Sequence, residues 1–309
     1  MAAAPLCAYI MDRRYDYPAL LAVCDIKLRS DVEPSYLNIY VGVRGRRRYL
    51  KTCLRYLESA ISTAGVDVRV VIVEQDDTPH HFDIAEKHGF DYVFIPMSES
   101  NSRGLYSRAL VYNVGFLAAG PAKWHVFHDC DLLVAADFFL KMRIHLDASP
   151  KWLQPYADQH VIKLGPGASE AIMNSTDLFD LARIDDLVPT GRGAPGGTIV
   201  VRGDVFREVG GYDPELFYGY APEDSMFWTK LELQNLRLDA IDRCHQGSAA
   251  YAENPRIDVY HLHHPMADAG NPELQNMEML QRVFWQMPYE EKNKVVELKR
   301  RLLAGEPCE

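Results

Sequence analysis

The chain has 309 residues, of which 48% are hydrophobic and 25% charged, as is typical of a soluble globular protein with a sizeable core. Its formal net charge of −10 argues against a protein held on nucleic acid by general electrostatics, because a polyphosphate requires a basic surface. The six cysteines show no CxxC pair and no zinc-ligand spacing, so we expect reduced thiols. The length accommodates one large α/β domain or two small ones.

No apolar stretch approaches the roughly 18 to 20 residues that span a bilayer, and MAAAPLCAYIMDRRYDYP at the N-terminus does not resemble a signal peptide. We therefore predict a cytoplasmic protein without a transmembrane segment, which acts at the inner membrane face if its substrate is lipid-linked. The alternative is a domain in the Golgi lumen from which an anchor has been removed. Residues 1–36 form an N-terminal extension whose pattern assigns it no role.

Residues 37–130 alternate between apolar runs and amphipathic segments. The expected strands are 37–43, 66–74, 92–96 and 124–130, and the expected helices are 47–64, 81–88 and 102–119. Strands that alternate with helices form βαβ units, so we predict a mostly parallel sheet covered on both faces. Ligands of such sheets bind beyond the carboxyl ends of the strands, where this chain places residues 44–46, 74–77 and 129–131.

From about residue 150 the chain has shorter strands and loops rich in glycine and proline, which we interpret as a substrate-facing rim. The expected strands are 161–164, 198–202, 236–241 and 258–262, and the expected helices are 170–183 and 225–233. The charged, amphipathic residues 275–303 predict a pair of helices separated at Pro288.

Two charged stretches indicate where a ligand binds. HVFHDCDLL, residues 125–133, places Asp129 and Asp131 at the end of an apolar run. An unpaired buried carboxylate costs several kcal/mol, so this pair requires a cation or strong hydrogen-bond donors, unless the strand leads into a helix N-cap. RGRRR, residues 44–48, suits a small anionic ligand, and a solvated helix start explains it equally well.

The order of several further motifs is more specific than any one of them. They are VGVRGR at 41–46, VIVEQDD at 71–77, YSRALVYNVGF at 106–116, FHDCDLL at 127–133, GG at 196–197, VGGYDPELFYGYAPEDSMFW at 209–228 and YHLHHP at 260–265. The series resembles the β-1,4-galactosyltransferase family, which carries FRNR, VIEQ, FNRAxLxNVG, FHDVDLL, a paired glycine, GFxNxYWGWGGED and a late metal-binding histidine in this order. The HxH-P ending is most similar to the proteoglycan-linker branch. GGYDPELFYGYAPED also resembles bacterial family-2-type glycosyltransferases that extend polysaccharides.

The resemblance covers about residues 38 to 265 and implies the GT-A nucleotide-diphospho-sugar transferase fold, with a mostly parallel central sheet, flanking helices and a smaller acceptor-side sheet. It implies an inverting, metal-dependent transfer of galactose or N-acetylgalactosamine from a UDP-sugar to a hydroxyl of a glycan or lipid-linked saccharide, as in polysaccharide biosynthesis. The predicted organisation is an extension (1–36), a catalytic domain with a donor half (37–150) and an acceptor half (151–265), and a helical tail (266–309).

The resemblance also assigns a metal site and a donor site. The metal residues are Asp131, His261 and His263, and the donor residues are Arg44, Arg46, Glu74, Arg108, Asp129, Gly196 and Gly197. A divalent cation such as Mn²⁺ stabilises a diphosphate leaving group, and guanidinium groups bind phosphate oxygens in bidentate fashion. Imidazoles two residues apart on an extended segment share a face. His264 stands where this branch has an acidic residue, so the choice among the imidazoles stays open.

The acceptor side is assigned to the segment that precedes and begins a helix. Its residues are Tyr218, Tyr220, Glu223 and Asp224. An acceptor hydroxyl is a poor nucleophile, and the resemblance implies that Asp224 takes its proton, with Glu223 beside it. Acidic residues are also favoured in a first helical turn, and the two interpretations are compatible. The tyrosines stand at the family's tryptophans and offer aromatic faces to a sugar.

Two departures concern the acceptor and the loops. Ala221 and Pro222 replace a pair of glycines, and Ser225 and Met226 follow the acidic pair where the family has further aspartates, so acceptor identity is not predicted. The paired glycines let the backbone approach the donor sugar, and residues 191–197 are a candidate lid.

The alternative functions are a non-catalytic glycan-binding protein on the same fold and a sugar nucleotidyltransferase. A nucleotidyltransferase would require a glycine-rich phosphate loop after the first strand.

Overall fold

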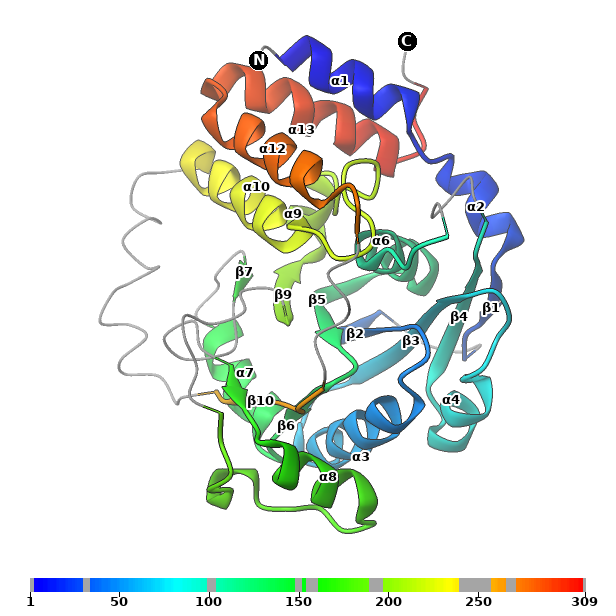
Figure 1. The fold of residues 1–309 in the computed structure, drawn as a ribbon, viewed down its shortest axis with the longest axis vertical. Helices are drawn as coiled ribbons and strands as arrows, with labels where there is room; N and C mark the ends of the chain where they lie inside the picture. The colour runs from blue at the N-terminus through cyan, green and yellow to red at the C-terminus, as the bar shows by residue number, and fades with distance from the viewer. Residues whose placement is uncertain are drawn as a thin grey trace.

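A seven-stranded sheet forms the centre of the computed structural model, which describes residues 3–29, 34–98, 104–147, 152–153, 161–188, 197–238, 257–264 and 271–307 (Figure 1). The strands are β1 (Asp25–Lys27), β2 (Ser35–Val43), β3 (Val68–Asp76), β4 (Asp91–Pro96), β5 (Ala122–Asp129), β7 (Trp152–Leu153) and β9 (Thr198–Arg202). Their order is β1-β4-β3-β2-β5-β9-β7. The four central strands β4, β3, β2 and β5 are parallel, and β1, β9 and β7 each pair antiparallel with a neighbour. The predicted mostly parallel centre of the sheet is therefore confirmed.

Both faces of the central strands are buried, as their continuous apolar sequences predict. Leu37, Ile39 and Val41 of β2 point to one face, into a core shared with α3 (Arg47–Thr63), α4 (Phe82–His88) and α7 (Phe138–Asp147). Tyr40 points to the other face, into a core shared with α6 (Arg108–Ala119) and α9 (Gly203–Glu208). The period of two along each strand thus assigns its side chains to two helical layers.

A second, smaller sheet lies beside the end of β5, as predicted for the acceptor side. It consists of β6 (Leu132–Val134), β10 (Val259–His261) and β8 (Ile162–Lys163), in the order β6-β10-β8. β10 is antiparallel to β6, with His261 opposite Leu132, and the Leu262 N–H donates to the Asp131 carbonyl oxygen at 2.9 Å. This pairing brings the late histidines to Asp131, which follows β5.

The two ends of the chain pack together. Helices α1 (Ala3–Asp12), α10 (Glu223–Leu238), α12 (Leu274–Gln286) and α13 (Tyr289–Leu303) share a hydrophobic core at the top of Figure 1. Pro288 separates α12 from α13, as the sequence predicts. The extension is part of the packed structure, because β1 adds to the sheet edge and Tyr17 of α2 (Tyr17–Val23) accepts a hydrogen bond from Asn113 Nδ2 at 2.6 Å.

Three predicted elements differ from the structure. The helix expected over 102–119 begins at Arg108, because Ser107 caps it by accepting a hydrogen bond from the Leu110 N–H. The helix expected over 170–183 is α8 (Pro166–Asn174) followed by a separate 3₁₀ turn, Leu181–Arg183. The strand expected over 236–241 is wrong for residues 236–238, which continue α10, and residues 239–241 lie outside the described part. Helices α7 and α9 have no counterpart among the predicted elements.

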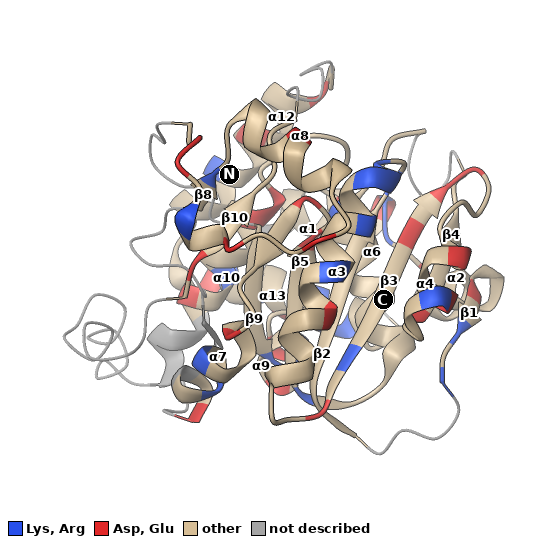
Figure 2. Ribbon diagram, turned by 90° about the horizontal axis from the view of Figure 1, so that it is seen from below, with Lys and Arg blue, Asp and Glu red and all other residues tan. Residues whose placement is uncertain are grey.

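In Figure 2 the central strands are mostly tan, which marks residues other than Asp, Glu, Lys and Arg. The acidic and basic residues lie mainly on helices and at strand ends. Such a distribution leaves the strand ends as the places where charged side chains can meet. Among the described residues, no helix is long and apolar enough to cross a membrane.

Candidate active site

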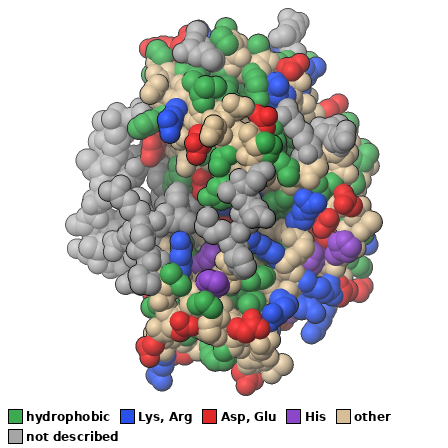
Figure 3. Space-filling view, viewed as in Figure 1, with side chains coloured by type: hydrophobic (Ala, Val, Ile, Leu, Met, Phe, Trp, Pro, Cys, Tyr) green, Lys and Arg blue, Asp and Glu red, His purple; other side chains and the backbone are tan. Residues whose placement is uncertain are grey.

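A carboxylate and two imidazoles converge where β5 leads into β6. Asp131 lies in the turn between these strands, and His261 and His264 come from the end of β10 and the residues after it. One ligand atom from each of the three side chains lies within 4.8 Å of the other two. Figure 3 shows histidine and basic side chains gathered near the middle of the face seen in Figure 1, around β6 and β10.

The structure brings His264 to this cluster in the place that the sequence assigns to His263. β10 ends at His261, so the strand pairing that would fix the alternation of residues 261 and 263 does not extend to His263. The His263 side chain is exposed, and its backbone N–H donates to Ser169 Oγ at 2.8 Å. His264 Nε2 instead lies 3.2 Å from Asp131 Oδ2.

The cluster fits a divalent cation. Asp131 is buried, and its Oδ1 atom has no hydrogen-bond partner among the described residues, while His261 Nε2 lies 3.9 Å away. Burial opposes ionisation of Asp131, but the hydrogen bond with His264 and the charges of His261 and Arg46 hold its pKa below the usual value. An ionised carboxylate beside two imidazoles is a mixed oxygen and nitrogen donor set that suits Mn²⁺.

Arg46 is held at this centre by an unusual backbone conformation. It has φ of +46°, the only positive φ of a non-glycine residue in the described part of the chain, and it immediately precedes α3. This left-handed conformation costs roughly 1 kcal/mol for a residue with a side chain. It directs the guanidinium to Asp131 Oδ2, with which Arg46 forms an ion pair. Arg44 lies near the end of β3, with its Nε 3.6 Å from Asp76 Oδ1.

Arg108, at the first position of α6, connects the donor and acceptor residues predicted from the sequence. Its guanidinium donates to both oxygens of Asp129 at 3.1 and 2.9 Å. Its Nε lies 2.9 Å from Glu223 Oε1, and its Nη2 lies 3.7 Å from Asp224 Oδ2. One cation therefore faces three carboxylates that come from positions 129, 223 and 224.

Asp129 is held by α6 and is distinct from Asp131 in its electrostatics. The Tyr112 hydroxyl donates to Asp129 Oδ1 at 2.8 Å. Burial, together with the negative charges of Asp131 and Asp224, raises the pKa of Asp129 to about 6, although Arg108 and Tyr112 act in the opposite direction. Sequence reasoning did not select Tyr112, yet its spacing of four residues from Arg108 places both on one face of a helix and could have identified it.

Glu74 lies at the end of β3 and is fully buried. Its carboxylate accepts hydrogen bonds from the backbone N–H groups of His80 and His81 and from the Tyr92 hydroxyl, and His81 Nδ1 lies 2.7 Å away. These contacts hold the loop after β3 and favour a structural role for Glu74 over the predicted donor contact.

Of the paired glycines and the candidate lid, the structure describes only Gly197. Its carbonyl oxygen accepts a hydrogen bond from the Asp129 N–H at 2.9 Å, and a Cβ atom there would lie 2.8 Å from Leu132 Cδ1. A side chain at position 197 would therefore require the Leu132 side chain to move. Gly196 and residues 191–196 of the lid lie outside the described residues.

The residues predicted to form the acceptor site lie at and before the start of α10. Glu223 and Asp224 occupy its first turn, as the sequence predicts for acidic residues. Tyr218 is buried in the core shared by the terminal helices, whereas Tyr220 is 60% exposed. Asn271 Nδ2 donates to the carbonyl oxygens of both tyrosines, at 2.7 and 3.1 Å, and holds this segment in place. Only Tyr220 therefore presents its ring to a ligand.

Glu223 predicts a pH dependence of stability. Burial and the nearby charges of Asp224 and Asp129 raise the pKa of Glu223 to about 7, although Arg108 lowers it. Between about pH 4.5 and 7 the folded state therefore keeps a proton that the unfolded state loses, and the free energy of unfolding falls as pH rises. We expect Glu223→Gln to remove this fall, so that the variant gains about 2 to 3 kcal/mol relative to wild type between pH 5 and 8.

Urea unfolding of both proteins at a series of pH values measures this difference. Glu278→Gln, at an exposed position of α12, is the matched control for removing a carboxylate, and it should follow the wild-type curve. Parallel curves for wild type and Glu223→Gln would contradict the assignment.

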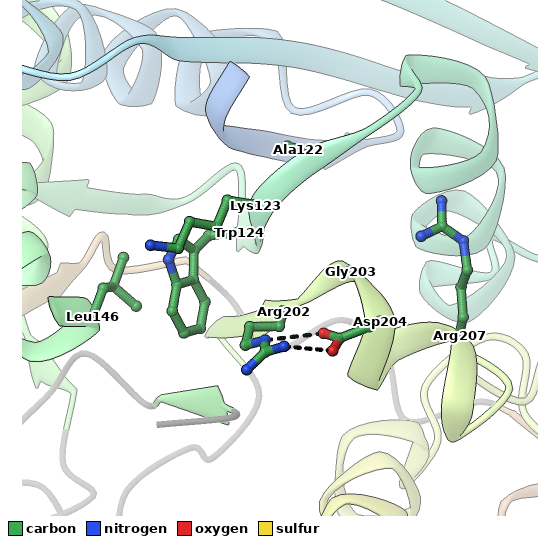
Figure 4. A pocket seen from close by; sticks show the side chains of 8 residues that line it. All are labelled: Ala122, Lys123, Trp124, Leu146, Arg202, Gly203, Asp204 and Arg207. Atoms are coloured by element: carbon green, nitrogen blue, oxygen red, sulfur yellow. Dashed lines mark hydrogen bonds and ion pairs between the residues drawn. The ribbon is translucent and has the colours of Figure 1, made fainter. Parts of the chain in front are cut away.

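A cavity of about 410 Å³ lies at the opposite, amino end of β5 (Figure 4). Trp124 and Lys123 line it from β5, and Arg202 and Asp204 line it from the end of β9 and the start of α9. Arg202 and Asp204 neutralise each other through two hydrogen bonds, of 3.0 and 2.6 Å. None of the candidate residues lines this cavity, and ligands of parallel sheets bind at the carboxyl ends of the strands, so we do not assign the donor site to it.

Comparisons with known proteins identify similar structures. No protein-family model matches the chain, and no curated protein matches it in sequence. The catalytic domain of Drosophila β1,4-galactosyltransferase 7, in complex with xylobiose, is 16% identical with a TM-score of 0.43, covering 80% of this chain and 79% of its own. GalNAc-T7 with UDP, GalNAc and Mn²⁺ is 12% identical with a TM-score of 0.48, covering 87% and 55%. A Pyrobaculum calidifontis mannosyltransferase with GDP-Man and Mn²⁺ is 11% identical with a TM-score of 0.45, covering 97% and 79%.

These similar structures are all glycosyltransferases, the class that the order of the sequence motifs resembles. The α/β architecture implied by that resemblance, with a central sheet, flanking helices and a smaller second sheet, is confirmed by the strand order of the chain itself.

Proposed function

We propose that this chain is an inverting, divalent-cation-dependent glycosyltransferase that moves galactose or N-acetylgalactosamine from a UDP-sugar to a hydroxyl of a glycan. The observation that carries the proposal is the convergence of Asp131 with His261 and His264, beside Arg46, at the carboxyl end of β5. Asp131 lies more than a hundred positions before the two histidines in the sequence, and the antiparallel pairing of β6 with β10 brings them together.

The leaving group of this reaction is a nucleoside diphosphate, whose negative charge must be stabilised as its bond to the sugar breaks. Asp131, His261 and His264 would hold a divalent cation, which supplies Lewis-acid stabilisation of the phosphoryl oxygens. Arg46 forms an ion pair with Asp131, and Arg44 lies two residues before Arg46 in the sequence. Both guanidinium groups can donate to phosphate oxygens. The buried Oδ1 atom of Asp131, which has no hydrogen-bond partner among the described residues, is the ligand atom that these contacts leave available.

The acceptor hydroxyl must lose a proton as it attacks the anomeric carbon. Asp224 is the proposed base, mounted in the first turn of α10, where the Ser225 N–H donates to its Oδ1 at 2.6 Å. Arg108 lies between this residue and Asp129, and so links the base to the donor side of the site. Attack from the face opposite the leaving group inverts the configuration of the sugar.

The exposed Tyr220 is the proposed stacking surface for an acceptor sugar, with Glu223 as a hydrogen-bond partner. The buried Tyr218 supports it through the segment that both residues share. Tyr220→Ala is expected to raise the acceptor KM by about tenfold and to leave hydrolysis of the donor unchanged, because stacking of one sugar ring contributes about 1 kcal/mol or slightly more.

Incubation with UDP-galactose, UDP-N-acetylgalactosamine and GDP-mannose, with Mn²⁺ or with EDTA, tests the proposal through release of free nucleotide. Cation-dependent release from a UDP-sugar, followed by transfer to members of a glycan array, is the expected result. Glycan binding without nucleotide binding would identify a lectin on this fold. Formation of a nucleotide sugar from a sugar phosphate would identify a nucleotidyltransferase.

A further inference from the structure

Four ionisable side chains outside the candidate active site are buried together. They are Asp213, Glu215, Lys230 and Lys299, none more than 2% exposed. Lys230 Nζ lies 2.7 Å from Asp213 Oδ2 and donates to the Gly211 carbonyl oxygen, and Lys299 Nζ donates to Glu215 Oε2. The two pairs are close enough to influence each other, since Asp213 acts on Glu215 and Lys299 acts on Lys230 electrostatically.

Burial of four charges is costly, and apolar side chains of similar volume often stabilise a fold at least as well. Burial accordingly raises the pKa of Glu215 and lowers that of Lys230. Buried charged pairs can instead fix how two segments pack, because each lysine must lie next to its own carboxylate. The position of the cluster shows which segments it would hold together.

The cluster joins the C-terminal helix to the segment that leads into the acceptor residues. Asp213 and Glu215 lie in residues 209–222, which connect α9 to α10, whereas Lys299 lies in α13. The backbone of α13 lies directly against this segment, since a Cβ atom on Gly210 would be 2.5 Å from the Lys299 carbonyl carbon.

Beyond Glu215 the same segment reaches the candidate site. The Ser107 hydroxyl, at the cap of α6, donates to the Phe217 carbonyl oxygen at 3.3 Å, and the Gly219 N–H donates to the Tyr106 carbonyl oxygen at 2.8 Å. The segment ends at the acidic pair that begins α10. Residues 209–222 therefore connect α13 directly to the candidate active site.

We infer that Lys299 is a positioning residue, which fixes the acceptor segment through its buried pair with Glu215 and makes α13 part of the acceptor site. Helix α13 lies beyond residue 265, where the sequence resemblance ends, so the inference concerns a feature of this chain outside that resemblance. The role of the segment in binding an acceptor rests on the proposed function, whereas its attachment to α13 does not.

Hydrogen exchange of the backbone amides of residues 211–222 tests the attachment without any assay of activity. The variants are Lys299→Met and the double variant Lys299→Met/Glu215→Gln, in which no unpaired charge stays buried. Exchange in this segment is expected to accelerate by about tenfold or more in both, while amides of β2 to β5 stay protected. Lys299→Arg, which keeps the charge, should restore protection in part. The matched control is Lys294→Met/Glu291→Gln, which removes a surface pair of the same helix and should change nothing.

Steady-state kinetics then test the consequence for the acceptor. The double variant is expected to raise the acceptor KM by about tenfold, with cation-dependent donor hydrolysis and UDP affinity unchanged. Unchanged exchange at 211–222 in the double variant, or equal loss of protection in β2 to β5, would overturn the positioning role. If the wild-type protein turns over no nucleotide sugar, the proposed function fails, and the exchange experiment still decides the attachment.

Discussion

Asp224→Asn is expected to reduce sugar transfer by about 100- to 10,000-fold while leaving the affinity for UDP within about twofold of wild type. Asparagine is nearly isosteric with aspartate and keeps the hydrogen bond from the Ser225 N–H to Oδ1, but it cannot accept a proton from the acceptor. The side chain is 22% exposed at the start of α10, so an acceptor can reach it. Initial rates with a saturating donor, together with UDP titration, measure the two quantities separately.

The control for Asp224→Asn is Asp204→Asn, which removes an exposed carboxylate paired with Arg202 at the opposite end of the sheet. Its transfer rate should equal that of wild type. A transfer rate unchanged in Asp224→Asn itself would show that another group takes the proton. Glu223, which is the nearest carboxylate in sequence and also faces Arg108, would then be the next residue to replace.

The second large effect is expected at the proposed metal site. Asp131→Asn should weaken binding of Mn²⁺ in the presence of UDP by at least about 100-fold, because it removes the only anionic ligand of the cluster. Transfer that depends on the cation should fall with it. Titration of Mn²⁺ followed by calorimetry, or by the paramagnetic resonance of the free ion, reports binding independently of turnover.

The two adjacent histidines allow the sequence and the structure to be compared directly. His264→Ala should weaken Mn²⁺ binding by about 10- to 100-fold, because its Nε2 lies 3.2 Å from Asp131 Oδ2, whereas His263→Ala should have little effect because its side chain is exposed. His88→Ala, at a histidine paired with Glu58 on α3, controls for loss of an imidazole elsewhere. A larger effect for His263 than for His264 would favour the ligand set predicted from the sequence.

Some features of the site depend on contacts that local sequence patterns do not contain. The alternation of side chains on an extended segment selected His263, but β10 ends at His261 and the chain then turns His264 toward Asp131. Arg108 was predicted to contact the donor, yet it also pairs with Glu223, which lies 115 positions further along the chain. The role of Glu74 in holding the loop after β3 likewise follows only from its hydrogen bonds with the backbone N–H groups of His80 and His81.

By itself, the sequence determined the alternation of strands and helices over residues 37–130, because the periods of apolar residues are local properties of each segment. It also determined that Asp129 and Asp131 lie at the end of a buried strand, and that two helices meet at Pro288. Only the tertiary structure decided which imidazole meets Asp131, how Arg108 is shared among three carboxylates, and that Lys299 reaches Glu215. Those outcomes depend on distances between residues far apart in the chain, which strand pairing and helix packing set together.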